Sequence, residues 1–254
     1  MPRTHTFVLV HGSWQGAWSW DRTSAILAAR GHRVFRPALP GHDPADTDRS
    51  QITHDDYVDA VLGAVAQSGP DPVVMVGHSL GGAVISQVAD RRPDRVARLV
   101  FYAAFVLRDG EAIGDLLGPE LRAALQQLSR ANPDRSMSMP WELWRSHFMQ
   151  TADNDTARAV YDRLVPEPYR PAFEPVRLPR LATLGLPAAY VSCRQDQTQP
   201  PGFWHPGMTS RLPGAPVIEI DGDHEALITV PDLLADALCA AADHPVTAEA
   251  RGAA

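Results

Sequence analysis

The chain has 254 residues, of which 44% are hydrophobic, so it is long enough for one large domain or two small ones with a buried core. Its formal net charge is -7 and no basic block occurs, which argues against nucleic acid or an anionic membrane surface as a partner. All 23 basic residues are arginine, and this excludes any mechanism that needs a lysine amine. We expect a small neutral or apolar substrate, and a monomer or homodimer.

The apolar run near the N-terminus spans only residues 7–10, before His11 and Gly12. This run is too short for a signal-peptide core or a membrane span, and we therefore expect a cytoplasmic protein. The two cysteines, Cys193 and Cys239, lack the spacing of metal ligands. We expect both to be reduced and structural.

Short apolar runs alternate with stretches of helical periodicity, which is typical of βα units and a mainly parallel sheet. The fold class predicted is therefore α/β, with a twisted sheet of about six strands flanked by helices. The strands are predicted at residues 6–10, 33–36, 72–76, 95–102, 187–191 and 216–220.

The rhythm breaks between residues 108 and 180, where no convincing strand occurs. Helical patterns cover residues 119–130 and 155–165, and prolines cluster after the second of them. We expect a helical cap at 108–180, inserted into a core that is formed by residues 1–107 and 181–243. The last residues, 244–254, are small and polar and are expected to form a flexible tail.

The most specific motif lies at residues 77–81, where an apolar run ends in GHSLG and a helical pattern starts at Ser79. This is G-x-S-x-G in a strand–turn–helix context, which predicts that Ser79 is a nucleophile on a tight turn. The helix behind the serine would aim its N-terminal amides at developing negative charge. The alternative is a glycine-rich turn that carries an incidental serine.

An activated serine needs a base and a carboxylate that orients the base, in the chain order Ser, Asp or Glu, His. Asp196 and His224 each follow a predicted strand near the end of the chain, at the sheet edge where ligands collect. His205 competes as the base, but it lies in a segment flanked by proline and glycine. Asp221 and Asp223 are so near the predicted base in sequence that they cannot easily reach the side of its ring that faces away from the serine.

Five stretches together carry a family resemblance over nearly the whole chain: LVHGSWQGAW, GHSLGGAV, RQD, DGDH and YDRLVPEPYRPAFEPV. With them the chain resembles the α/β-hydrolase superfamily, and within it the branch of plant-type methylesterases, hydroxynitrile lyases and their bacterial relatives. The resemblance implies a catalytic triad of Ser79, Asp196 and His224. It also implies an oxyanion hole formed by the backbone N–H groups of Ser13 and Leu80, with no metal and no cofactor.

The function expected from this resemblance is carboxylic ester hydrolysis by two-step acyl transfer. A hydroxynitrile lyase is one alternative, but lyases of the plant type carry threonine at the position of Gly12 and lysine at the position of Glu225. A carboxylate at position 225 would oppose an anionic leaving group. A protein that only binds a small ligand, or a non-hydrolytic tailoring protein, is the other alternative.

The expected cap contains SMSMPWELWRSHFM, which is rich in methionine and aromatic residues. These residues predict either an amphipathic helix that packs on the core or the wall of an apolar pocket. No charged residue stands out as an anchor for an anionic substrate, which favours neutral esters or lactones. The candidate pocket residues are Gly12, Trp14, Phe105, Trp141, Trp144, Phe148 and Trp204.

Overall fold

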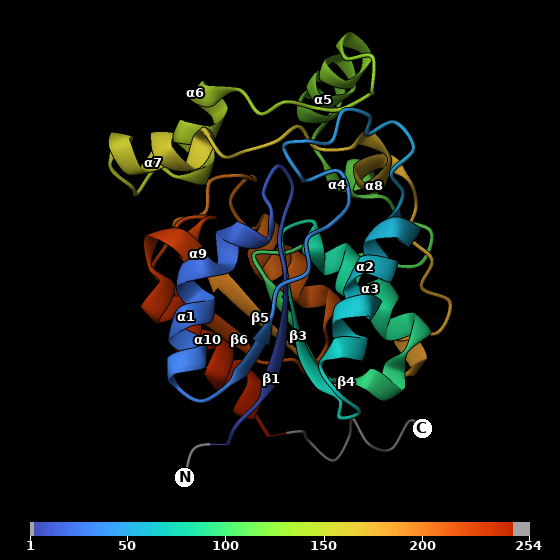
Figure 1. Cartoon of the computed structure of the whole chain (residues 1–254), viewed down its shortest axis with the longest axis vertical. Coiled ribbons are helices and arrows are strands. Elements are labelled where there is room, and N and C mark those ends of the chain that lie inside the picture. Colours follow the sequence, from blue (N-terminus) through green and yellow to red (C-terminus); the bar gives the residue numbers. More distant parts are fainter. Residues whose placement is uncertain (1–2, 246–254) are drawn as a thin grey trace.

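A single sheet of six parallel strands forms the centre of the protein in a computed structural model that describes residues 3–245. The strands lie in the order β2-β1-β3-β4-β5-β6 (Figure 1). Their bounds are β1 Thr6–Val10, β2 Arg33–Phe35, β3 Val73–His78, β4 Val96–Tyr102, β5 Ala188–Cys193 and β6 Val217–Ile220. All six predicted strands are confirmed to within two residues at each end.

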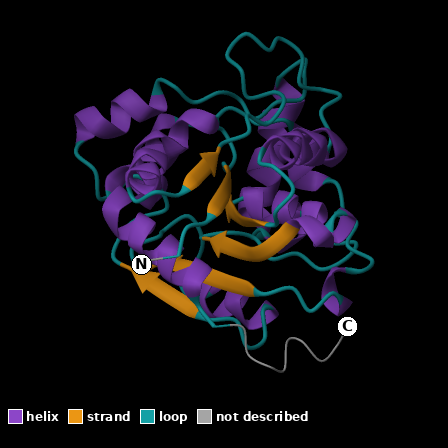
Figure 2. Ribbon diagram, turned by 60° about the horizontal axis from the view of Figure 1, so that its bottom comes forward, coloured by secondary structure: helices purple, strands orange, loops and turns teal. Residues whose placement is uncertain are grey.

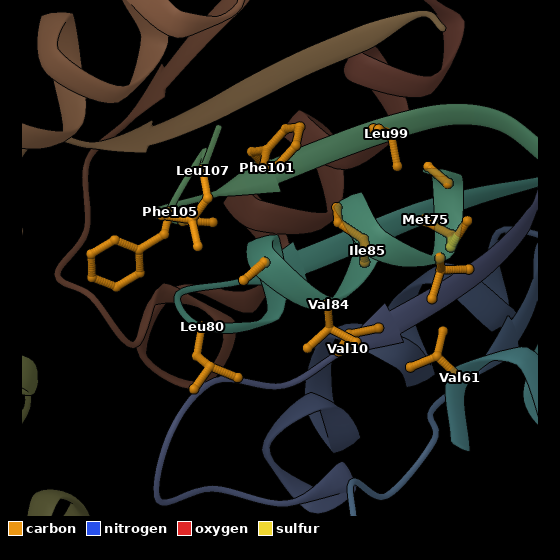
Figure 3. Packing of buried hydrophobic residues seen from close by; sticks show 14 of the residues in the cluster. Val10, Val61, Met75, Leu80, Val84, Ile85, Leu99, Phe101, Phe105 and Leu107 are labelled. Atoms are coloured by element: carbon orange, nitrogen blue, oxygen red, sulfur yellow. The ribbon is translucent and has the colours of Figure 1, made fainter. Parts of the chain in front are cut away.

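Helices cover both faces of the sheet, as Figure 2 shows. The strand β1 illustrates why both faces need a cover, because its successive side chains point to opposite faces and those of residues 7–10 are all apolar. Phe7 and Leu9 belong to one buried cluster, and Val8 and Val10 belong to another. The helices outside the long insertion described below are α1 Asp21–Ala29, α2 His54–Gln67, α3 Gly81–Arg91, α9 Ala226–Thr229 and α10 Pro231–Asp243. Figure 3 shows the second cluster, in which Val84 and Ile85 of α3 pack near strand residues such as Val10 and Phe101.

Short 3₁₀ and π turns also occur between the strands and helices. They are η1 Ala17–Trp20, η2 Pro93–Arg95, η3 Trp144–Phe148, η4 Leu181–Thr183, η5 Phe203–Met208 and η6 Thr209–Arg211. The fully buried Trp20 at the end of η1 is a packing residue. Cys193 and Cys239 are both free thiols.

The order of the strands creates a switch point between β1 and β3. From β1 the chain proceeds to β2 on one side, and it then returns to place β3 on the other side. The loops that follow β1 and β3 therefore diverge and leave a crevice at the carboxyl edge of the sheet, which is where ligands bind in open α/β sheets. The motif residues after these two strands, Ser13 and Ser79, both lie at this edge.

Residues 103–187, between β4 and β5, form an insert in which helices alternate with irregular segments. Its helices are α4 Ile113–Leu116, α5 Pro119–Ala131, α6 Trp141–Leu143, α7 Asn154–Tyr161 and α8 Tyr169–Phe173. In Figure 1 the helices α5, α6 and α7 lie beyond the carboxyl ends of the strands. The helix predicted at 155–165 ends early, because Val165 donates its N–H to the carbonyl of Trp14 instead of continuing the helix.

None of the helices in residues 3–245 is long and apolar enough to cross a membrane. Of the tail expected at 244–254, only the first two residues are described, and the rest lies outside the described residues.

Candidate active site

The predicted nucleophile, Ser79, lies on a sharp turn between β3 and α3. Its φ is +53°, a left-handed conformation that is uncommon for residues other than glycine. The Ser79 N–H donates to the carbonyl of Tyr102, and the Phe105 N–H donates to the Ser79 carbonyl, both at 3.2 Å. Because φ at Ser79 is not helical, α3 begins at Gly81 and not at Ser79 as predicted.

Two glycines allow the chain to close tightly around this turn. A Cβ atom on Gly77 would lie 2.5 Å from the carbonyl oxygen of Gly81. A Cβ atom on Gly12 would lie 2.9 Å from the Cβ of Ser79. Since both distances are far below van der Waals contact, this turn and the loop after β1 can approach as they do only with glycine at these positions.

The predicted base and its carboxylate are in direct contact. The Nδ1 atom of His224 lies 2.6 Å from an oxygen of Asp196. The other Asp196 oxygen accepts hydrogen bonds from the hydroxyl of Thr198 at 2.5 Å and from its N–H at 2.9 Å. Because Nδ1 is engaged, Nε2 is the ring nitrogen that remains for another partner.

Thr198 was not predicted as part of this site. A hydroxyl two residues after an aspartate has the spacing of an Asx turn, which is the signal that could have found it. Its hydroxyl also accepts a hydrogen bond from the indole of Trp204 at 3.2 Å.

Burial and charge act in opposite directions on this pair. Burial alone lowers the pKa of His224, but the negative charge and hydrogen bond of Asp196 outweigh it, so the pKa is raised above its ordinary value of 6.5. For Asp196, burial raises the pKa, but the facing imidazole and the hydrogen bonds from Thr198 lower it by more. The pKa of Asp196 is therefore below its ordinary value. Each member of the pair thus favours the charged form of the other.

The backbone of His224 is anchored to the strands beneath it. Its carbonyl accepts hydrogen bonds from Nε2 of His78 at 3.1 Å and from the hydroxyl of Tyr102 at 2.8 Å. Burial holds the pKa of His78 well below its ordinary value, so this ring is neutral and its one N–H lies on the nitrogen that donates. The base is thus held on two sides, through its ring and through its carbonyl.

The two amides predicted to form an oxyanion hole are available to a ligand. Within residues 3–245, neither the Ser13 N–H nor the Leu80 N–H donates a hydrogen bond to another protein group. Leu80 follows Ser79 directly and precedes the first turn of α3, whose positive dipole end favours negative charge.

Ser79 and His224 both line a cavity of about 80 Å³. Four of the candidate pocket residues also line it: Trp14, Phe105, Phe148 and Trp204. The remaining apolar lining is Ile113, Leu117, Leu121, Leu125, Met137, Met139, Leu143 and Ala172, and the remaining polar lining is Ser13, Glu167, Thr198 and Gln199. A wider groove of about 1040 Å³ shares Leu121, Leu143 and Trp204 with the cavity and adjoins it.

A model of the alpha/beta hydrolase family matches residues 7–237. The chain belongs to this family. A carbendazim hydrolyzing esterase from Nocardioides sp. (strain SG-4G) is 31% identical over an alignment of 243 residues, and the match covers 92% of this chain and 98% of that protein. Methylesterase 7 of Arabidopsis thaliana is 29% identical over 93% of this chain and 96% of its own length.

A solved structure of an extracellular alpha/beta-hydrolase from a Paenibacillus species superimposes with a TM-score of 0.89 at 34% identity. The match covers 95% of this chain and 100% of that one, and that hydrolase shares structural and functional homology with tobacco salicylic acid binding protein 2. These similarities place the chain in the branch of alpha/beta hydrolases that holds plant methylesterases and bacterial esterases. It is a carboxylic ester hydrolase.

Three candidate pocket residues do not line the cavity of this alpha/beta hydrolase, namely Gly12, Trp141 and Trp144. Trp144 is fully buried and stacks on Phe148 with ring centres 5.2 Å apart. Trp141 packs against the ring of Tyr161, also at 5.2 Å. The side chains of the two tryptophans point elsewhere because successive side chains of a helical segment point in different directions, and within this segment Phe148 is the aromatic residue that lines the cavity.

The interpretation of Glu225 also needs correction. Its side chain is fully buried and receives hydrogen bonds at 2.7 Å from the amide of Gln15, and it does not line the cavity. Burial raises its pKa to about 8, so it carries little charge at neutral pH. A carboxylate that opposes an anionic leaving group is therefore not what this residue supplies.

His205, the competing candidate base, is exposed and bonds to the hydroxyl of Thr209 at 2.7 Å. It lines the outer groove, not the cavity that holds Ser79.

The two competing carboxylates are engaged elsewhere. Asp221 forms an ion pair with Arg194 at 3.0 Å. Asp223 is buried and accepts hydrogen bonds from the hydroxyls of Thr151 and Thr229. Among the three candidates, Asp196 is the one that contacts the ring of the predicted base.

Three buried side chains, His78, His224 and Glu225, can each offer one metal-ligand atom within 4.8 Å of the others. Each of them has a hydrogen-bond partner within the protein, namely the His224 carbonyl, Asp196 and Gln15 respectively, although Nδ1 of His78 has none among the described residues. Because ester hydrolysis would use Nε2 of His224, we assign no metal site to this group.

Proposed function

We propose that this hydrolase cleaves a small, neutral carboxylic ester with an apolar or aromatic group, methyl esters and lactones included, through an acyl-enzyme on Ser79. One observation carries the proposal: a serine on a strained turn and a histidine backed by a buried carboxylate open on the same apolar cavity. Serine hydrolases on several folds use this combination of residues.

The proposed reaction has two steps. His224 takes the proton of Ser79 through Nε2 while the serine oxygen attacks the ester carbonyl. The N–H groups of Ser13 and Leu80 stabilise the oxyanion, and the alcohol leaves with the proton that the imidazole returns. Water, activated by the same imidazole, then hydrolyses the acyl-enzyme.

The lining of the cavity supports a neutral substrate. Most of the lining is apolar or aromatic, and none of the described residues that form it is an arginine. Its one carboxylic acid, Glu167, is hydrogen-bonded to other protein groups. An anionic substrate would meet no arginine in the wall of this cavity, and its desolvation would cost free energy.

We propose that the insert acts as the cap over this site, as expected for residues 108–180. Leucines and methionines of the insert form much of the cavity wall, for example Leu121, Leu125 and Met137. Flexible methionines beside aromatic rings suit an apolar acyl or alcohol group.

The test is a panel of methyl esters, aryl esters and lactones, measured with the wild type and with Ser79→Ala. We expect turnover by the wild type, and a loss of several orders of magnitude in Ser79→Ala with the fold retained, because triad members act as a unit. A fluorophosphonate probe should label the wild type and not the variant. Wild-type turnover in Ser79→Ala would refute the proposal.

Two other outcomes would identify the alternatives. Tight binding of small ligands without ester turnover and without probe labelling would indicate a binding protein. Release of cyanide from mandelonitrile would indicate a lyase, which Gly12 disfavours because lyases of the plant type carry threonine at this position.

A further inference from the structure

Glu167 is a buried carboxylate that the proposed reaction does not use. It lies on the insert between α7 and α8, and its side chain has no exposed surface. Its backbone pairs with Met137 in both directions, at 2.8 and 2.9 Å. Because a buried carboxylate costs free energy unless its oxygens are hydrogen-bonded, its partners indicate what it does.

The partners of Glu167 come from three segments of the core. One carboxylate oxygen accepts the N–H of Trp14 at 3.0 Å and lies 2.9 Å from Nε2 of His42. The other oxygen accepts the hydroxyl of Tyr57 at 3.2 Å. A side chain of the insert is thus fixed on the loop that follows β1.

Trp14, the residue bound in this way, has a strained backbone. Its φ is +62°, which is a clear outlier for a bulky side chain. Such a conformation persists only where the surroundings impose it. Besides the bond to Glu167, the indole N–H donates to the carbonyl of Met137 at 2.7 Å and the Trp14 carbonyl accepts the N–H of Val165 at 2.9 Å.

All three of these hydrogen bonds therefore join Trp14 to the insert. Trp14 directly follows Ser13, whose N–H is one of the two proposed oxyanion donors. On the other side of Ser13, Gly12 packs against the nucleophile. The direction of the Ser13 amide is consequently set by Gly12 on one side and by the strained, insert-bound Trp14 on the other.

We infer that Glu167 is a positioning residue that holds the oxyanion loop, residues 12–14, in its working conformation and so makes the geometry of the hole depend on the insert. The inference rests on the proposed function, because the loop matters for turnover only if Ser13 stabilises an oxyanion. Its effect should fall on the transition state, in which the oxyanion exists, and not on the binding of the ester.

Glu167→Leu and Glu167→Gln form the decisive pair of variants. Leucine has a similar size and no acceptor, and we expect it to lower kcat between about 10- and 100-fold with KM little changed, since a misplaced catalytic group costs that much. The amide oxygen of glutamine can still accept the Trp14 N–H, and we expect kcat within about 3-fold of the wild type. Ser129→Ala, which removes a buried hydrogen bond elsewhere in the insert, is the control for general destabilisation.

A trifluoromethyl ketone analogue of the best ester gives a second readout, because it forms an oxyanion on the serine. Its inhibition constant should rise in Glu167→Leu by the same factor by which kcat falls, and should not change in Ser129→Ala. Should Glu167→Leu fail to fold, Glu167→Asp keeps the charge but is one methylene too short to reach both Trp14 and Tyr57, and it should show the same loss. Unchanged kcat in folded Glu167→Leu, or in Glu167→Asp where the leucine variant does not fold, would overturn the inference.

Hydrogen exchange separates this inference from the proposed function. The amides of residues 12–16 should exchange faster in Glu167→Leu than in the wild type or in Ser129→Ala, whatever the substrate. Faster exchange with unchanged kcat would limit Glu167 to a structural role and refute the inference, whereas a wild type without Ser79-dependent turnover would refute the proposed function itself.

Discussion

The chemistry of single residues in this site follows from what each of them faces. His224 and Glu225 are neighbours in sequence and both are buried, yet they are perturbed differently. The imidazole faces Asp196, which raises its pKa, whereas Glu225 faces the neutral amide of Gln15 and burial raises its pKa to about 8. A carboxylate partner favours the charged form of the first, whereas burial outweighs the nearby imidazole and the hydrogen bond of Gln15 and leaves the second mostly protonated.

The raised pKa of His224 predicts how activity depends on pH. The base must be neutral to accept the serine proton, so kcat/KM should rise with pH and reach half of its maximum above pH 6.5. In Asp196→Asn the largest contribution that raises the pKa is lost, so the midpoint should move down, and kcat should fall by roughly 10³-fold or more.

Asp221→Asn is the matched control for this prediction, because it removes an exposed carboxylate that pairs with Arg194 and does not touch the imidazole. A pH–rate profile of the three proteins is the measurement. The same midpoint in Asp196→Asn and in the wild type would contradict the assignment of the pair.

The raised pKa of Glu225 predicts how stability depends on pH. Its folded-state pKa of about 8 exceeds the ordinary 4.5, so its contribution to stability is fully present below pH 4.5 and is lost as the pH rises to about 8. Glu225→Gln removes this titration. The unfolding free energy of the variant relative to the wild type should therefore increase by a few kcal/mol between pH 4.5 and 8. Denaturant titrations at several pH values would measure it, and a difference independent of pH would contradict the prediction.

At the scale of elements, the site depends on the junctions where strands end. The turn from β3 to α3 presents Ser79, and the loop after β1 presents Ser13. Both junctions contain a left-handed residue that is not glycine, Ser79 in one and Trp14 in the other, and each such residue costs about 1–3 kcal/mol. The surrounding hydrogen bonds must offset this cost, which ties the stability of these junctions to the packing of the insert and the core.

Gly77→Ala tests how closely the first junction is packed. The new methyl group would lie 2.5 Å from the carbonyl oxygen of Gly81, which is backbone and cannot move away cheaply. We expect the free energy of unfolding to fall by about 1–3 kcal/mol. We also expect kcat to fall by a larger factor than KM changes, because the turn that carries the nucleophile must shift. Gly118→Ala, where a Cβ meets no atom within 4 Å, is the control. Equal stability of the two variants, by thermal or denaturant unfolding, would contradict the prediction.

The sequence predicted the bounds of the strands better than those of the helices in the insert. The inner strands β1, β3, β4 and β5 are almost wholly buried, and parallel strands buried on both faces leave a clear apolar pattern. The edge strands β2 and β6 are partly exposed, but all six strands were placed to within two residues at each end. The ends of the helices in the insert were harder to predict. Val165 fits the helical pattern in the sequence, but its N–H donates to the carbonyl of Trp14, which is about 150 residues away in the chain. Local periodicity contains no information about such a partner.

For the molecule as a whole, the family signature and the order of its elements were enough to predict the α/β fold and a sheet of about six strands. The sequence by itself determined the G-x-S-x-G turn, the separation of Ser79, Asp196 and His224 along the chain, and the lack of lysine chemistry, because these depend on residue type and on local spacing. It also predicted Trp14, Phe105, Phe148 and Trp204 as lining residues.

The tertiary structure decided the rest. It directed Trp141 and Trp144 away from the cavity, buried Glu225 against Gln15, and brought Glu167 of the insert onto the loop after β1. The physical reason is the same in each case: the direction and the charge of a side chain depend on partners that are distant in sequence, and only the packing of the sheet against the insert selects those partners.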